Sequence, residues 1–140
     1  MKNSLKKIIF AGALLGFVVT NTNLDIASAN NSDDTEYYMK WPSGGLGVQY
    51  TGDRAKEDKT SSYINAQWIG NGRQLYAWVA DSDYNDRSGG HKYFISAGEP
   101  RKLANVVKEE GRNYARIAAN LKGTSAVSIA SGGLWSPDSR

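Results

Sequence analysis

Two neighbouring stretches of the chain alternate strictly between hydrophobic and polar positions. In residues 62–69, every second position from Ile64 is hydrophobic, namely Ile64, Ala66 and Trp68. In residues 74–80, Leu75, Ala77 and Val79 alternate with Tyr76 and Trp78, which would lie on the other face of a strand. A period of two is that of a β-strand with one buried face. Gly70-Asn71-Gly72-Arg73 separates the two stretches, and Asn-Gly favours the positive φ angles of a tight reversal. The pattern predicts a β-hairpin over residues 62–80.

Other short segments of the chain are also typical of strands, and most are bounded by glycine or proline. The predicted strands cover residues 37–41, 46–50, 91–97, 113–121 and 126–130. Residues 101–110 change period, because Leu103, Val106 and Val107 fit one face of a short helix between Pro100 and Gly111. We therefore expect an all-β fold, a small antiparallel β-sandwich with one short helix near 101–110, and an immunoglobulin-like topology is compatible with it. An α+β domain is the alternative.

The first 29 residues have the pattern of a secretory signal peptide. Lys2, Lys6 and Lys7 precede the uncharged run of residues 8–19, which is shorter than the about 20 residues of a membrane span. Ala27-Ser28-Ala29 supplies small residues for cleavage between Ala29 and Asn30. We expect a secreted, extracellular protein that consists of a flexible leader at residues 30–36 and one domain at residues 37–140.

The net charge and the absence of cysteine exclude several kinds of partner and site for this domain. Three lysines and one aspartate lie in residues 1–29, so the net charge falls from +3 for the whole chain to +1 for the remainder. This charge is too small for the dense positive field that nucleic-acid binding needs. The absence of cysteine excludes disulfides and thiolate metal sites, and in an exported protein it is typical of Gram-positive bacteria.

The residues of catalytic sites are scarce in this chain. His91 is its one histidine, it follows Ser88-Gly89-Gly90 in a predicted turn, and no Gly-x-Ser-x-Gly motif is present. The acidic residues gather in loops and do not form an evident catalytic pair on the predicted strands. The sequence therefore predicts a protein that is not an enzyme and has no organic cofactor.

One loop has oxygen ligands at the spacing with which a calcium loop begins. Asp81, Asp83, Asn85 and Asp86 supply them, although Asp86 stands where an EF-hand has glycine and Lys92 where it has glutamate. An irregular calcium site is one interpretation, and a solvated turn is the other.

All four tryptophans and all eight tyrosines lie beyond residue 29. The alternation places Tyr76 and Trp78 on one strand face, with Tyr63 across from them in the predicted hairpin. If exposed, this face is a platform on which sugars stack, and if covered it is core. The parity of the strand assigns Trp68 to the buried face with Ile64. We expect Tyr63, Tyr76 and Trp78 to bind a ligand such as a cell-wall glycan or a surface protein.

The C-terminus contains a further motif, Ser131-Gly132-Gly133-Leu134-Trp135-Ser136-Pro137-Asp138-Ser139. This tail, with residues 102–111, resembles a family of small secreted Gram-positive proteins known as domain of unknown function 2712, apart from one additional glycine. The resemblance implies secretion and no catalytic residue. We expect Trp135 to pack on the core, with a recognition tail as the alternative, and Asp138 to accept hydrogen bonds from nearby amides in a turn.

The function that fits these features is that of a secreted, non-enzymatic binding protein at or outside the cell wall. A bacteriocin-like secreted antagonist is the alternative. A membrane-active antagonist usually carries a cationic amphipathic segment, and neither the charge of the chain nor its strand-like alternation favours one.

Overall fold

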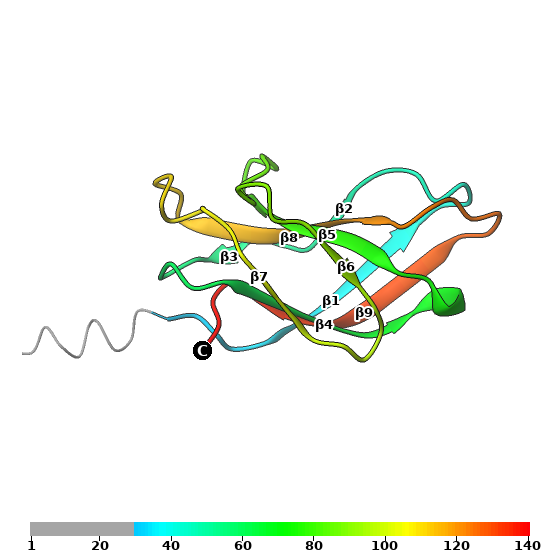
Figure 1. Ribbon diagram of the computed structural model, residues 1–140, viewed down its shortest axis with the longest axis horizontal. Coiled ribbons are helices and arrows are strands. Elements are labelled where there is room, and N and C mark those ends of the chain that lie inside the picture. Colours follow the sequence, from blue (N-terminus) through cyan, green and yellow to red (C-terminus); the bar gives the residue numbers. More distant parts are fainter. Residues whose placement is uncertain (1–29) are drawn as a thin grey trace, which may run out of the picture.

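The computed structural model describes residues 30–140 as two antiparallel β-sheets that face each other as two layers (Figure 1). The predicted signal peptide lies outside the described residues. Sheet A has the strand order β1 (Thr35–Trp41), β9 (Ile129–Ser136), β4 (Ser62–Ile69) and β7 (Arg101–Leu103). The last strand of the chain is thus an inner strand of its sheet, paired with β1 and β4.

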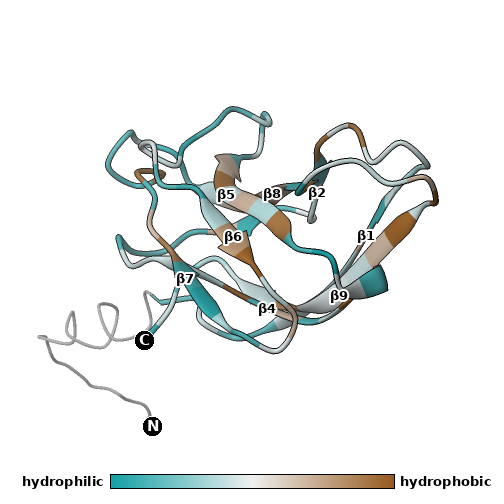
Figure 2. Cartoon of the chain, turned by 45° about the vertical axis from the view of Figure 1, so that its right-hand side comes forward, coloured by the Kyte–Doolittle hydropathy of each residue, from teal (hydrophilic) through white to brown (hydrophobic). Residues whose placement is uncertain are grey.

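Sheet B forms the second layer. Its order is β2 (Gln49–Tyr50), β8 (Tyr114–Leu121), β5 (Leu75–Asp81) and β6 (Tyr93–Ile95), and β3 (Arg54–Ala55) also pairs with β8. Several of the most hydrophobic segments lie on strands, among them β5 and β6, whereas many of the loops are hydrophilic (Figure 2). The all-β sandwich predicted from the alternation is confirmed.

The hydrophobic core lies between the two sheets. Ile64 and Ala66 of β4 point inward from sheet A, and Leu75, Ala77 and Val79 of β5 point inward from sheet B. The largest fully buried apolar side chains of this core are Trp41, Trp135, Met39, Ile64, Leu75, Ile95, Leu103 and Ile117. Trp135 is 2% exposed, which confirms the prediction that the tail packs on the core.

The predicted hairpin over residues 62–80 is wrong, although both of its strands exist. A single 3-10 turn, η1 (Gly70–Gly72), leads from β4 in sheet A to β5 in sheet B, with Asn71 at φ +54°. The two strands bury their apolar faces against each other across the sandwich. Alternation fixes which face of a strand is buried, but two strands that face one core from opposite layers show the same pattern as a hairpin.

The predicted helix at residues 101–110 is also absent. Leu103 is buried as the last residue of β7, and Val107 is buried in the loop that follows. One helical turn forms where the N–H of Glu110 donates to the carbonyl oxygen of Val106 at 2.9 Å, and the chain leaves it at Gly111 with φ +77°. Apolar spacing over so short a segment is shared by a helix and by a strand followed by a turn.

Residues after β9 bind the C-terminus to the start of the described chain through hydrogen bonds and an ion pair. Asp138 Oδ2 accepts hydrogen bonds from the backbone N–H groups of Asn31 at 2.7 Å and Glu57 at 3.0 Å, which confirms that this carboxylate bonds nearby amides. Its Oδ1 lies 2.6 Å from Nζ of Lys56, and both side chains are fully buried. The contacts of Asn31 and the start of β1 at Thr35 therefore lie N-terminal to Tyr37, the residue at which the sequence predicts the domain to begin.

Candidate functional site

The outer face of sheet B carries a row of aromatic side chains. Tyr76 of β5 pairs across the strands with Phe94 of β6, and their ring centroids are 5.1 Å apart. The Trp78 ring lies 6.3 Å from that of Tyr76 on the same face, as the parity of β5 predicts. On the neighbouring strand β8, Ala118 stands opposite Trp78, so a small side chain leaves room for a large one.

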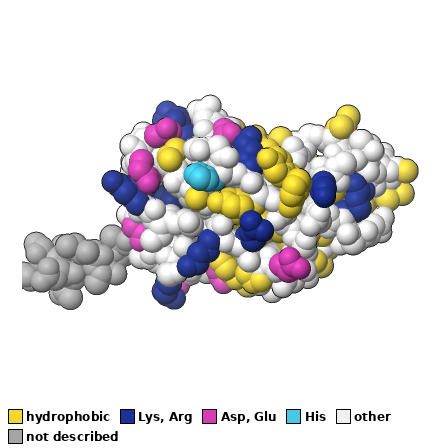
Figure 3. All heavy atoms as spheres, in the orientation of Figure 1, with side chains coloured by type: hydrophobic (Ala, Val, Ile, Leu, Met, Phe, Trp, Pro, Cys, Tyr) yellow, Lys and Arg dark blue, Asp and Glu magenta, His cyan; other side chains and the backbone are white. Residues whose placement is uncertain are grey.

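Two lysines lie on these rings. Lys92 Nζ is 4.4 Å from the Trp78 centroid, and Lys122 Nζ is 4.5 Å from the Phe94 centroid. An ammonium over an aromatic face is attracted by the ring quadrupole, so the lysines and rings hold one another in place. Figure 3 shows one face of the molecule on which hydrophobic side chains lie beside lysine and arginine.

A groove of about 410 Å³ follows this row at the end of β8. Tyr76, Phe94 and the two lysines line it together with Asn120, Leu121 and Gly123. Phe94 is 49% exposed, so a ligand can reach its ring. Lys122 belongs to no ion pair among residues 30–140, whereas Lys92 pairs with Asp86 at 3.2 Å. The groove thus combines flat apolar surface with positive charge.

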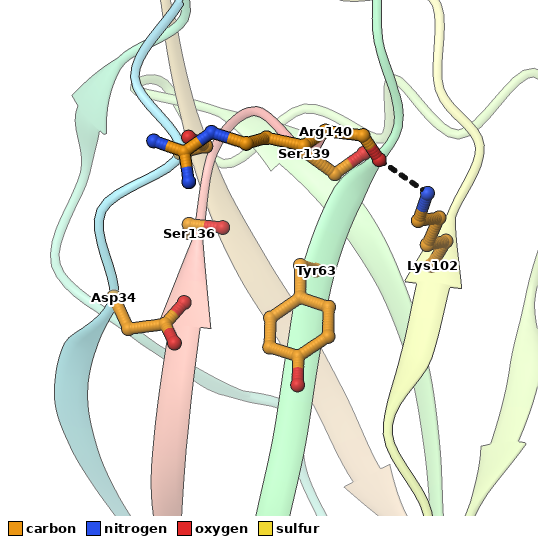
Figure 4. A pocket seen from close by; sticks show the side chains of 7 residues that line it. Asp34, Tyr63, Lys102, Ser136, Ser139 and Arg140 are labelled. Atoms are coloured by element: carbon orange, nitrogen blue, oxygen red, sulfur yellow. Dashed lines mark hydrogen bonds between the residues drawn. The ribbon is translucent and has the colours of Figure 1, made fainter.

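The three residues of the predicted platform do not lie together. Tyr76 lines the groove. Trp78 is only 9% exposed, because Lys92 lies over its ring and Val48 and Tyr50 pack against the cluster that contains it. Tyr63 lies on β4 in the other sheet, beside Ser136 of β9 and Lys102 of β7 (Figure 4). The three side chains would share one face only if β4 and β5 were neighbours in a hairpin, and these strands lie in different sheets.

Of the seven residues that line the groove, sequence reasoning identified only Tyr76 as a ligand contact and missed the exposed ring and both lysines. Phe94 lies within the predicted strand 91–97, and its alternation with Tyr93 and Ile95 contained the signal for an outward side chain. Lys92 and Lys122 gave no such signal, because their position over the rings results from the pairing of β6, β5 and β8.

In the loop after β5, the carboxylates of Asp81 and Asp86, which the sequence predicts as calcium ligands, contact amides and cationic side chains. Asp81 Oδ1 accepts hydrogen bonds from the N–H groups of Asp83 at 2.9 Å and Asn85 at 3.0 Å, and Oδ2 accepts one from Nε of Arg87 at 2.8 Å. Asp86 turns its carboxylate to Lys92 and to the N–H of Ser88. Within residues 30–140, no three His, Cys, Asp or Glu side chains are grouped closely enough to hold an ion.

The same contacts shift the acidity of these carboxyls. Burial raises the pKa of Asp81, but the hydrogen bonds from Arg87, Asn85 and Asp83 and the charge of Arg87 outweigh burial and hold that pKa below its ordinary value. For Asp86, burial acts in the same upward direction and the contacts with Ser88 and Lys92 again lower the pKa. These carboxylates therefore stabilise a loop through amides and cationic side chains.

No curated protein and no solved structure matches the chain. None of the helical turns in residues 30–140 has the length and apolar character that crossing a membrane requires. The family described as "Protein of unknown function (DUF2712)" matches residues 25–139, which include the whole sandwich and the C-terminal motif. The chain therefore belongs to the DUF2712 family.

Proposed function

We propose that the protein is a secreted, non-enzymatic binding protein of a Gram-positive bacterium and that it acts at or outside the cell wall. The signal-peptide pattern of residues 1–29 and the absence of cysteine support secretion from such a cell. The non-enzymatic part of the proposal is supported by the single histidine of the chain, His91, which lies exposed after a glycine turn.

The observation that carries the binding role is the groove on sheet B. Tyr76 and Phe94 present rings that can lie against the apolar faces of sugar units, and rigid rings lose little entropy on binding. Lys122 and Lys92 flank these rings and complement negative charge. We therefore propose that the ligand is an anionic glycan or polyol phosphate of the cell wall.

A sedimentation assay with insoluble cell walls tests this function. The Phe94→Ala variant should bind at least tenfold more weakly than the unmodified protein, because Phe94 lines the groove with a ring that is 49% exposed. Tyr114→Ala is the matched control: Tyr114 has the same 49% exposure and lies on β8 of the same sheet, but it does not line the groove.

A second pair of variants tests the charge of the ligand. Lys122→Glu should abolish retention on walls, whereas Lys59→Glu, an exposed charge reversal in the loop after β3, should not. Removal of the anionic polymers from the walls should have the same effect as Lys122→Glu. Equal binding by Phe94→Ala and Tyr114→Ala would contradict the proposal.

Secretion needs its own measurement. Mass spectrometry of culture supernatant should find a chain that begins at Asn30. A chain that keeps Met1 and stays in the membrane fraction would contradict the predicted cleavage.

A further inference from the structure

The outer face of sheet A, on the opposite side of the sandwich, has a separate aromatic pair. Tyr38 of β1 and Trp68 of β4 are 63% and 46% exposed, and their ring centroids are 6.2 Å apart. Both residues are register partners of Gly132 on β9, the strand between them. The three residues therefore form one row across the sheet.

A β-bulge turns Trp68 outward. Ala66 pairs with Gly133 and Trp68 with Gly132, so Gln67 is an extra residue in β4. Side chains alternate strictly in a regular strand, and without the extra residue Trp68 would point into the core with Ile64 and Ala66. After the bulge Ile69 takes the inward position, and Trp68 lies outside. Bulges re-aim side chains in this way next to binding sites.

The two glycines of β9 accommodate this arrangement. A Cβ on Gly132 would lie 2.8 Å from three atoms of the Trp68 indole, so the ring rests directly on the backbone. A Cβ on Gly133 would collide with the carbonyl oxygen of Asn65 beside the bulge. One face of the indole is therefore supported by β9, and the ring remains nearly half exposed.

The chemistry of this surface differs from that of sheet B. A groove of about 300 Å³ is lined by Glu36, Gln67 and the glycine backbone as well as by the aromatic pair. Its charged side chain is a carboxylate, and no lysine or arginine is among these lining residues. Carboxylate and amide groups beside an aromatic ring suit the hydroxyls and the apolar face of an uncharged sugar, whereas an anionic polymer would be repelled by Glu36.

We propose that Tyr38 and Trp68 form a second glycan-binding site, specific for uncharged oligosaccharides, so that one molecule bridges an anionic and a neutral glycan. The second site stands on its own observations, and the bridging role rests on the proposed function of the sheet B groove. Because the two sites lie on the outer faces of opposite sheets, both can be occupied at once.

Calorimetric titration with the hexamer of N-acetylglucosamine, an uncharged probe, and with cellohexaose tests the second site. Trp68→Ala and Tyr38→Ala should each weaken binding of one of these probes at least tenfold. Tyr114→Ala and Phe94→Ala should leave it unchanged, because both residues lie on the other sheet. No binding of either probe by the unmodified protein, or equal binding by Trp68→Ala, would overturn the proposal.

Bridging is measured by capture of the labelled neutral hexamer on an immobilised anionic wall polymer. The unmodified protein should capture the hexamer, and Trp68→Ala should lose capture while still binding the polymer. Phe94→Ala should lose both polymer binding and capture but still bind the hexamer in solution. If Phe94→Ala keeps polymer binding, the proposed function fails. If the unmodified protein binds each glycan alone but captures nothing, bridging fails.

Discussion

Replacing Asp138 by alanine should destabilise the protein strongly, because its carboxylate is the partner of a fully buried ammonium. Lys56 Nζ donates to Asp138 Oδ1 at 2.6 Å and to the carbonyl oxygens of Asp58 at 2.9 Å and Thr60 at 2.5 Å. The other carboxylate oxygen accepts the N–H groups of Asn31 and Glu57. The substitution removes three hydrogen bonds at once and takes the nearer counter-ion from the buried ammonium, which keeps only the carboxylate of Asp58 at 4.0 Å.

The magnitude follows from these contacts. Removal of one partner of a buried ion pair costs about 3–5 kcal/mol, most of it from the uncompensated charge. A domain of this size has a free energy of unfolding of about 5–15 kcal/mol, so the loss is a large fraction of the total. With a urea dependence of about 1–3 kcal/mol per molar, the unfolding midpoint should fall by more than about 1 M.

Urea denaturation followed by tryptophan fluorescence is the assay, with two further variants as controls. Asp138→Asn keeps an oxygen for the two amides and should lose less stability than Asp138→Ala. The double variant Lys56→Met with Asp138→Leu removes both charges and should be more stable than Asp138→Ala alone. A midpoint of Asp138→Ala within about 0.3 M of the unmodified protein would refute this account of the tail.

Further predictions concern the sandwich itself. Trp78→Ala should lower the free energy of unfolding in urea by about 3 kcal/mol, because Trp78 is 9% exposed. Trp68→Ala should lower it by less than about 1 kcal/mol, because its ring is 46% exposed. The reverse order of the two losses would mean that the bulge is absent. Gly133→Ala should lower the free energy of unfolding by about 3 kcal/mol or more, since its Cβ has no space beside Asn65, and near-normal stability would contradict the register of β4 with β9. The folded-state pKa of Asp81 and Asp86 lies below the unfolded value near 4, so the stability that they supply is complete above about pH 5 and is lost as the pH falls through the folded pKa. Urea midpoints should therefore decline below pH 5, and Asp81→Asn should flatten that decline; an unchanged slope would contradict the assignment.

Local chemistry could be predicted from the sequence, and long-range pairing could not. The strand over residues 62–69, the shared face of Tyr76 and Trp78, and the role of Asp138 in bonding amides depend on alternation or on turn chemistry, and the structure confirms them. The direction of Trp68 was wrong, because one residue of bulge reverses the parity on which the prediction rested. That bulge depends on Gly132 and Gly133, more than sixty residues away.

The candidate site shows the same division. Tyr76 was predicted as a ligand contact and lines the groove, but Trp78 is covered by residues from other segments. The acidic spacing of residues 81–86 is real, yet Arg87 and Lys92 supply the positive charge that the calcium prediction assigned to an ion. Which cation faces a carboxylate is decided by the folded loop and not by the spacing of the acids.

The position of β9 determines when sheet A can assemble. Because β9 lies between β1 and β4, residues 35–41 have no strand neighbour in the sheet until residues 129–136 arrive. Contacts between segments so distant in sequence form late and slowly. For a chain exported N-terminus first, as we propose, nearly the whole polypeptide must cross the membrane before this layer closes. In a chain exported in this way, sheet A closes only when export is almost complete, whereas the strands of sheet B do not depend on β9.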